Sequence, residues 1–228
     1  MPTAPVPPSG PPGPCGPDGG PPLLIACALT VERLALRGAA RGPAALAGPV
    51  TLVRTGMGPE RAGRAVRSAL APGPPAGTAV LAAGFCAGLV PGMRPGDVVV
   101  ADTVRHPAGT IRCTAPALLA AAVARAVPGR RVHTGPLTAA DHVVRGAERA
   151  LLRTTGAIGV DMESAATLRA ALGTGPRPVA AVRVVVDAPG HELIRPGTVR
   201  GGLSAFRVLR AVLPAFQEWH LSLPLPRR

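Results

Sequence analysis

The sequence predicts one α/β domain in which helices cover both faces of a β-sheet. Of its 228 residues, 47% are apolar, enough to bury a full core in one domain. Short Val-rich runs bounded by Gly, Pro or Asp alternate with helical patterns along most of the chain. The runs are continuously apolar, which indicates strands buried on both faces. Together these observations favour a three-layer α/β architecture.

The order of the expected elements follows from the positions of these runs. We expect strands at 23–29, 50–54, 78–84, 97–101, 131–134, 157–160 and 179–186. We expect helices at 59–70, 115–127, 147–153, 161–172 and 199–213. Pro59 fits the first turn of its helix, and Pro214 is expected to interrupt the last one.

The first 22 residues differ in composition from the rest. They hold ten Pro and five Gly, which predicts a disordered tail with polyproline II character. The tail has no apolar run of the kind found in a signal peptide, and no stretch of 18 uncharged apolar residues occurs later. We therefore expect residues 1–22 to be a tail and residues 23–228 to form the domain.

The net charge of +13 comes entirely from arginine, since the chain has no Lys. A very GC-rich genome would produce the same Arg, Ala, Gly and Pro bias. The arginines are scattered and aromatic residues make up 2%, so a nucleic-acid surface is not expected. A basic surface favours phosphate-bearing ligands or anionic membranes. The four cysteines form no CxxC pair, which argues against zinc and disulfides and predicts reduced thiols in the cytoplasm.

Polar residues and glycines follow several predicted strands, where ligands bind in α/β sheets. Glu32 follows the first strand. The alternative interpretation is that Glu32 is a solvated residue in the first turn of a helix. Gly56-Met57-Gly58 follows the second strand and can present backbone N–H groups to an anion. Gly84-Phe85 ends the third, where small residues permit close approach of a ligand. Ordinary tight turns are the alternative for both glycine segments.

Two later segments place carboxylates at strand ends. Asp161-Met162-Glu163 opens a helix, with helix capping as the alternative. Asp187 ends an apolar strand that also contains Arg183, with a turn-forming role as the alternative. We expect Asp187 to be partly desolvated, which raises the pKa of a carboxyl group.

The order of these segments resembles the purine nucleoside phosphorylase/nucleosidase superfamily, which includes the methylthioadenosine/adenosylhomocysteine nucleosidases. Segments 55–61, 84–86 and 160–164 look most like the hopanoid-associated phosphorylases. The resemblance implies a three-layer sandwich around a central mixed β-sheet and a homo-oligomer. It also implies release of adenine from an adenosyl substrate, and adenosylhopane is the first candidate for that substrate. The alternative is a soluble nucleosidase acting on methylthioadenosine, adenosylhomocysteine or a futalosine-like nucleoside.

The resemblance also implies roles for individual residues. Glu163 would accept hydrogen bonds from the ribose hydroxyls, and Met162 would pack beside the sugar. Asp187 would protonate or hydrogen-bond the purine N7 as the base leaves. Glu32 would position and activate water. Val143 and Val144 would line the base site with apolar side chains.

The chemistry of an N-glycosidic bond needs the same residue types. Cleavage builds positive charge on the ribose, which a carboxylate stabilises, and negative charge on the base, which a proton donor neutralises. No metal or organic cofactor is expected. Inorganic phosphate is an open co-substrate, for which Arg183 and the amides of 56–58 are the expected ligands.

Two features depart from the family pattern. Phe85 stands where the nucleosidases carry Ser, and Ala82 where trimeric phosphorylases carry Arg, so hydrolysis and phosphorolysis both stay open. Phe85 is expected to line a pocket for a large apolar 5′ substituent. Apolar residues also recur at 203, 206, 209, 213 and 216. They predict either a core-packing helix or a patch that touches the inner face of a membrane carrying a lipid-linked substrate.

Overall fold

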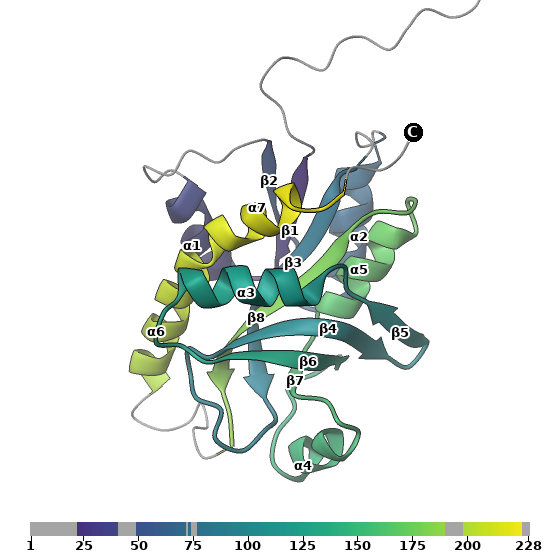
Figure 1. Ribbon diagram of the computed structural model, residues 1–228. Helices are drawn as coiled ribbons and strands as arrows, with labels where there is room; N and C mark the ends of the chain where they lie inside the picture. Colours follow the sequence, from purple (N-terminus) through teal and green to yellow (C-terminus); the bar gives the residue numbers. More distant parts are fainter. Residues whose placement is uncertain (1–21, 41–48, 72, 74–76, 190–197, 225–228) are drawn as a thin grey trace, which may run out of the picture.

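The computed structural model describes residues 22–40, 49–71, 73, 77–189 and 198–224. The tail expected at 1–22 lies, apart from Pro22, outside the described residues. The chain forms one mixed sheet of eight strands with helices on both faces (Figure 1). This confirms the predicted α/β fold with a central mixed sheet.

Seven strands coincide with the seven apolar runs, and one was not predicted. The strands are β1 Leu23–Cys27, β2 Val50–Arg54, β3 Ala79–Gly88, β4 Val98–His106, β5 Gly109–Arg112, β6 Val132–Ala139, β7 Gly159–Asp161 and β8 Val179–Asp187. The additional strand, β5, pairs with β4 as an antiparallel hairpin. Its short, largely exposed sequence lacks the apolar pattern that marks the others.

The strand pairing brings several strand ends to one place. Strands β2, β1 and β3 are parallel neighbours. Beyond them, the pairs β3–β8, β8–β4, β4–β6, β6–β7 and β7–β3 close a ring. Ala87 of β3 is in register with both Asp187 of β8 and Val160 of β7. The carboxylate that ends β8 therefore lies next to the segment that leads into Asp161.

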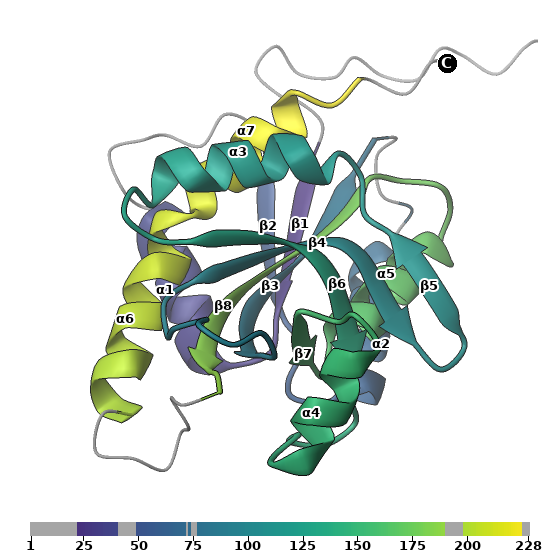
Figure 2. The same cartoon turned by 60° about the horizontal axis from the view of Figure 1, so that its bottom comes forward.

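Helices cover both faces of the sheet. They are α1 Thr30–Ala40, α2 Pro59–Leu70, α3 Pro116–Ala126, α4 Ala147–Thr154, α5 Ser164–Leu172, α6 Thr198–Ala211 and α7 Leu213–Leu221. Helices α1, α3, α6 and α7 cover one face, and α2 and α5 cover the other (Figures 1 and 2). Helix α4 stands apart at the end of the sheet in both views. Helix α1 was not predicted, since β-branched residues open it and Gly38 lies inside it.

The C-terminal helices belong to the core, as the core-packing interpretation of their apolar residues predicted. Leu209, Leu213 and Phe216 are fully buried and pack in the same core cluster as Trp219. Of the expected apolar stripe, only Leu203 is exposed. The helical structure is interrupted next to Pro214, as predicted: α6 ends at Ala211, and Pro214 lies in the first turn of α7. Within the described residues, no helix combines the length and apolarity needed to cross a membrane.

The cysteines in the described part of the chain are buried free thiols. These are Cys27, Cys86 and Cys113. Burial raises the pKa of Cys27 and Cys113 to about 12 in each case. Both thiols are therefore protonated and unreactive near neutral pH.

Candidate active site

The predicted site residues gather around one cavity of about 230 Å³ at the end of the sheet. Those that line it are Glu32, Phe85, Val143, Val144, Met162, Glu163 and Asp187. The remaining three, Gly58, Gly84 and Arg183, lie against the carboxylates of this lining. The structure thus brings together segments that lie far apart in the sequence.

Glu32 is buried, which excludes the alternative of a solvated first-turn residue. Its side chain is held by three backbone amides: Oε2 accepts hydrogen bonds from Ala28 and Leu29, and Oε1 accepts one from Phe85, each at 2.8 Å. Burial raises the pKa of Glu32, while the charge of Arg183 and these hydrogen bonds oppose the rise. The carboxylate is therefore fixed in place at the wall of the cavity.

Glu163 lies on the same cavity and is held by the glycine turn after β2. Its Oε1 accepts a hydrogen bond of 2.9 Å from the Gly58 amide. Gly58 has φ +95°, a conformation that glycine adopts readily. Burial raises the pKa of Glu163, and Arg183 again opposes the rise. The Gly58 amide, expected to face an anionic ligand, instead holds the Glu163 carboxylate at the cavity wall.

Asp161 and Arg183 form the layer beneath these carboxylates. Asp161 Oδ2 accepts hydrogen bonds from the amides of Glu163, at 3.3 Å, and Ser164, at 2.9 Å. The same oxygen lies 2.6 Å from Nη2 of Arg183, whose Nε donates to Ser164 Oγ at 2.9 Å. Burial alone would lower the pKa of Arg183, but Asp161, Glu163 and Glu32 outweigh it and raise the pKa. Asp161 thus caps α5 and also fixes the buried guanidinium.

Gly84 lets Arg183 and Glu32 approach each other. A Cβ at position 84 would lie 2.5 Å from both Arg183 Nη1 and Glu32 Oε1. Nη1 of Arg183 is buried and has no hydrogen-bond acceptor among the described residues. A donor beside a carboxylate oxygen suits a water molecule, which accepts a hydrogen bond from the donor and donates one to the carboxylate.

Asp187 is paired with a residue that the sequence analysis missed. Its Oδ1 accepts a hydrogen bond of 3.0 Å from Nη1 of Arg149, and its Oδ2 forms an ion pair with Nη2. Nε and Nη2 of Arg149 also donate to the Val144 carbonyl, at 3.2 and 3.3 Å. Asp187 is buried as expected, and both of its carboxylate oxygens face the guanidinium of Arg149. Its role as the proton donor stays a prediction.

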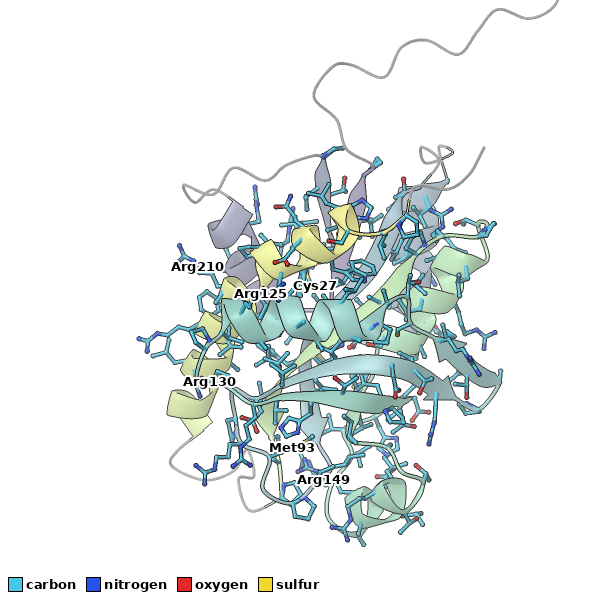
Figure 3. The ribbon with its side chains drawn as sticks, viewed as in Figure 1. Cys27, Met93, Arg125, Arg130, Arg149 and Arg210 are labelled. Atoms are coloured by element: carbon cyan, nitrogen blue, oxygen red, sulfur yellow. The ribbon has the colours of Figure 1, made fainter. Side chains whose placement is uncertain are left out.

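The two valines of the predicted base site differ in exposure. Val144 is buried and packs with Leu89, Ala157 and Val160, while Val143 is 54% exposed at the mouth of the cavity. The valines lead into α4, which carries Arg149 (Figure 3). No signal in the sequence distinguishes Arg149 from the other scattered arginines.

A second cavity, of about 720 Å³, adjoins the first and shares His142 and Met162 with it. It is lined by residues of α2, α5 and the β4–β5 hairpin. Nδ1 of His142 lies 2.6 Å from Oδ1 of Asp141, and Nε2 lies 3.0 Å from Oε1 of Glu148. The hydrogen bonds to these carboxylates raise the pKa of His142. The site is therefore not closed around a nucleoside but continues into a larger space.

Solved structures with this fold include several nucleosidases. The chain superposes on the methylthioadenosine/S-adenosylhomocysteine nucleosidase of Neisseria meningitidis with a TM-score of 0.72 and 17% identity, covering 87% of this chain and 99% of that one. For the adenine complex of the Colwellia psychrerythraea nucleosidase, the TM-score is 0.69 at 19% identity, with 88% and 96% covered. For the futalosine hydrolase of Helicobacter pylori, it is 0.69 at 17% identity, with 86% and 97% covered. These likenesses show the fold.

The family itself is shown by sequence. No curated protein matches the chain in a direct comparison. The family model of the phosphorylase superfamily, however, matches residues 44–214, about three quarters of the chain. That span includes the turn at Gly58, the carboxylates Glu163 and Asp187, and Arg183. The chain therefore belongs to the phosphorylase superfamily and is an enzyme of the nucleoside phosphorylase/nucleosidase type.

Proposed function

We propose that the enzyme cleaves the N-glycosidic bond of an adenosyl compound and releases adenine. The observation that carries this proposal is the set of three buried carboxylates, Glu32, Glu163 and Asp187, around one cavity. Burial of three carboxylates in one small site costs free energy, which indicates that the carboxylates serve the function of the site. They suit a reaction in which an oxocarbenium-like ribose and a leaving base develop charge.

Glu163 and Glu32 form the part of the site that suits the ribose. Both are fixed by backbone amides, so their orientation is set before a substrate binds. Met162, beside Glu163, offers an apolar surface to the sugar ring. Positive charge that develops on the ribose would be stabilised most by Glu163, because this carboxylate has one backbone hydrogen bond and Glu32 has three.

Asp187 and the Val144 carbonyl form the part that suits the base. Both groups accept hydrogen bonds, and the residues that carry them line the cavity. Adenine carries an amino group that can donate to such acceptors. A protonated Asp187 would supply the proton to the departing base, since general acid catalysis requires the donor within hydrogen-bond reach.

We propose water as the nucleophile. Arg183 Nη1 and Glu32 Oε1 meet at Gly84, which suits a small molecule that both accepts and donates hydrogen bonds. A phosphate dianion would lie beside two carboxylates. The other nitrogens of Arg183 already bind Asp161 and Ser164, and the Gly58 amide already binds Glu163. These contacts leave few donors for phosphate, which supports hydrolysis over phosphorolysis.

For the 5′ substituent, adenosylhopane is the first candidate. Phe85 on the cavity wall and the adjoining cavity of about 720 Å³ support a bulky apolar group. The likeness of 55–61 and 84–86 to hopanoid-associated phosphorylases supports the same substrate. For this substrate we propose that the enzyme is a homo-oligomer. It would act in the cytoplasm, at the inner face of the membrane.

A second candidate is a nucleosidase acting on methylthioadenosine, adenosylhomocysteine or a futalosine-like nucleoside. One observation favours it: the apolar residues of α6 and α7 are used in the core. The described C-terminal helices thus offer no continuous apolar face to a membrane. Several solved proteins of the same fold are, by their names, nucleosidases of these compounds.

One assay tests these proposals together. Purified protein is given adenosylhopane in mixed micelles, methylthioadenosine, adenosylhomocysteine or futalosine, with and without inorganic phosphate, and the free base is followed. Adenine release without phosphate supports hydrolysis, and a strict need for phosphate rejects it. Higher kcat/KM for methylthioadenosine than for adenosylhopane rejects the lipid assignment. Release of no base from any substrate rejects the proposed function.

A further inference from the structure

Arg149 occupies the acceptors that the proposed base subsite offers. Its guanidinium makes two contacts to the carboxylate of Asp187 and two to the carbonyl of Val144. The side chain is 8% exposed and itself lines the cavity of about 230 Å³. Arg149 and both residues that it contacts therefore belong to the lining of one cavity.

The guanidinium presents the same kind of donor as an aminopurine edge. Both are flat, and both carry N–H groups next to one another on a conjugated C–N framework. An amino group that donates to Asp187 and Val144 would take the place of the Arg149 nitrogens. A base that made these contacts inside a cavity of about 230 Å³ would need the space that the Arg149 guanidinium fills, so we expect the base and Arg149 to exclude each other.

Arg149 also covers both oxygens of Asp187. Its Nη1 donates to Oδ1, and its Nη2 forms an ion pair with Oδ2. Because a general acid must lie within hydrogen-bond reach of the leaving base, Asp187 can take that role only after this pair has opened. The same movement would thus clear the subsite and expose Asp187.

The position of Arg149 suits such a movement. Helix α4 stands apart from the layers at the end of the sheet (Figures 1 and 2), and Arg149 reaches from it toward the strand ends (Figure 3). Neighbouring side chains of α4 are open to solvent, with Leu151 66% exposed. A shift of this helix disturbs the main core clusters little, since only Leu152 packs in the small cluster with Val144.

We propose that Arg149 is an internal competitor for the base subsite, a residue that closes the empty site and that the base must displace. The inference rests on the proposed function, because it takes Asp187 and Val144 as the base subsite. Arg149 then acts through Asp187. We expect its removal to change the affinity for the base more than the rate of bond cleavage.

The test is the affinity of adenine, measured by calorimetry, for the wild type, Arg149→Met and Arg149→Lys. We expect Arg149→Met to bind adenine about tenfold to a hundredfold more tightly, the range given by loss of competing hydrogen bonds to a charged group. Arg149→Lys keeps the charge but cannot bridge Asp187 and Val144, so an intermediate affinity is expected. Arg153→Met, on the exposed part of α4, is the matched control and should bind adenine like the wild type.

Each outcome decides between distinct conclusions. If Arg149→Met folds but binds adenine no more tightly than the wild type, the competitor is rejected. If Arg149→Met does not fold, Arg149→Lys carries the test, and wild-type affinity there rejects the competitor. In turnover, KM should fall while kcat stays within a few-fold; a hundredfold lower kcat at unchanged KM would make Arg149 a catalytic residue instead. If neither the wild type nor any variant binds adenine, the base subsite and the proposed function fail together.

Discussion

Arg183 and Asp161 form an ion pair beneath the cavity, with Nη2 of Arg183 2.6 Å from Oδ2 of Asp161 and each side chain 1% exposed. The pair joins the middle of β8 to the end of β7. Glu32 and Glu163 also interact with this guanidinium. One cation thus balances several buried carboxylates, and the site depends on it electrostatically.

We predict that Arg183→Met lowers the free energy of unfolding by about 3–5 kcal/mol, because it leaves Asp161 buried without its partner. Urea unfolding followed by circular dichroism measures the change. Arg153→Met, at an exposed position of α4, should stay within about 0.5 kcal/mol of the wild type. Equal stability of the two variants would show that the ion pair contributes nothing.

Gly84→Ala should disturb the same region by crowding. The new Cβ would lie 2.5 Å from Arg183 Nη1 and from Glu32 Oε1, so both charged groups have to move. We expect a loss of about 1–3 kcal/mol in unfolding free energy, as for overpacked cores, together with loss of base release. Gly202→Ala in α6 is the control: its Cβ meets nothing within 4 Å, and a gain of up to about 1 kcal/mol is expected. Full activity in Gly84→Ala would contradict the close approach.

Much of the fold could be predicted because its signals are local. Val-rich runs marked the strands of the sheet, and the helix at 59–70 was predicted with the bounds of α2. The residues next to strand ends, such as Glu32 and Glu163, could be named because the carboxyl ends of strands place side chains at one edge. Strand β5 was missed because four largely exposed residues carry no such pattern.

The rest depended on contacts between distant segments. Arg149 is 38 residues from Asp187 in sequence, and no local pattern reports their pairing. The prediction that Asp187 is a proton donor was therefore made without knowledge of the residue that is paired with it. The C-terminal apolar stripe was ambiguous for a similar reason, since periodicity does not distinguish a core-facing helix from a membrane-facing one.

The pH dependence of stability should report the burial of Glu163. Burial raises the pKa of this carboxyl, so the folded protein binds its proton more tightly than the unfolded chain. Its contribution to stability is then greatest below the unfolded pKa and is lost as the pH rises through the folded pKa. Glu163→Gln cannot titrate, and its Oε1 can still accept from the Gly58 amide.

We therefore predict that the unfolding free energy of Glu163→Gln improves relative to the wild type as the pH rises above about 4.5. Urea unfolding at several pH values up to 7.5 measures this difference. Glu60→Gln, at an exposed position of α2, should show no such trend. A difference that is constant with pH would mean that Glu163 titrates as an exposed carboxyl does.

Phe216→Ala tests the core role of α7. Phe216 is fully buried, and such a truncation costs about 3–5 kcal/mol of unfolding free energy. Leu221→Ala, at a position 47% exposed, should cost under about 1 kcal/mol. If Phe216→Ala were as stable as the wild type but bound anionic vesicles less well, α7 would face a membrane after all.

Asp187→Asn tests the general acid and separates it from the charge of Arg149. We predict that kcat for adenine release falls on the order of 10²-fold or more, because Asn cannot supply the proton. Glu218→Gln, a surface carboxylate 52% exposed at its side chain, is the control and should keep wild-type turnover. A loss of activity in Asp187→Asn has a second explanation, since the substitution also leaves Arg149 without its carboxylate. The double variant Asp187→Asn/Arg149→Met removes that stranded charge. If the acid is what matters, the double variant stays as inactive as Asp187→Asn, although it should bind adenine more tightly. Recovery of turnover in the double variant would show that Asp187 serves to neutralise Arg149 and that the proton comes from another group.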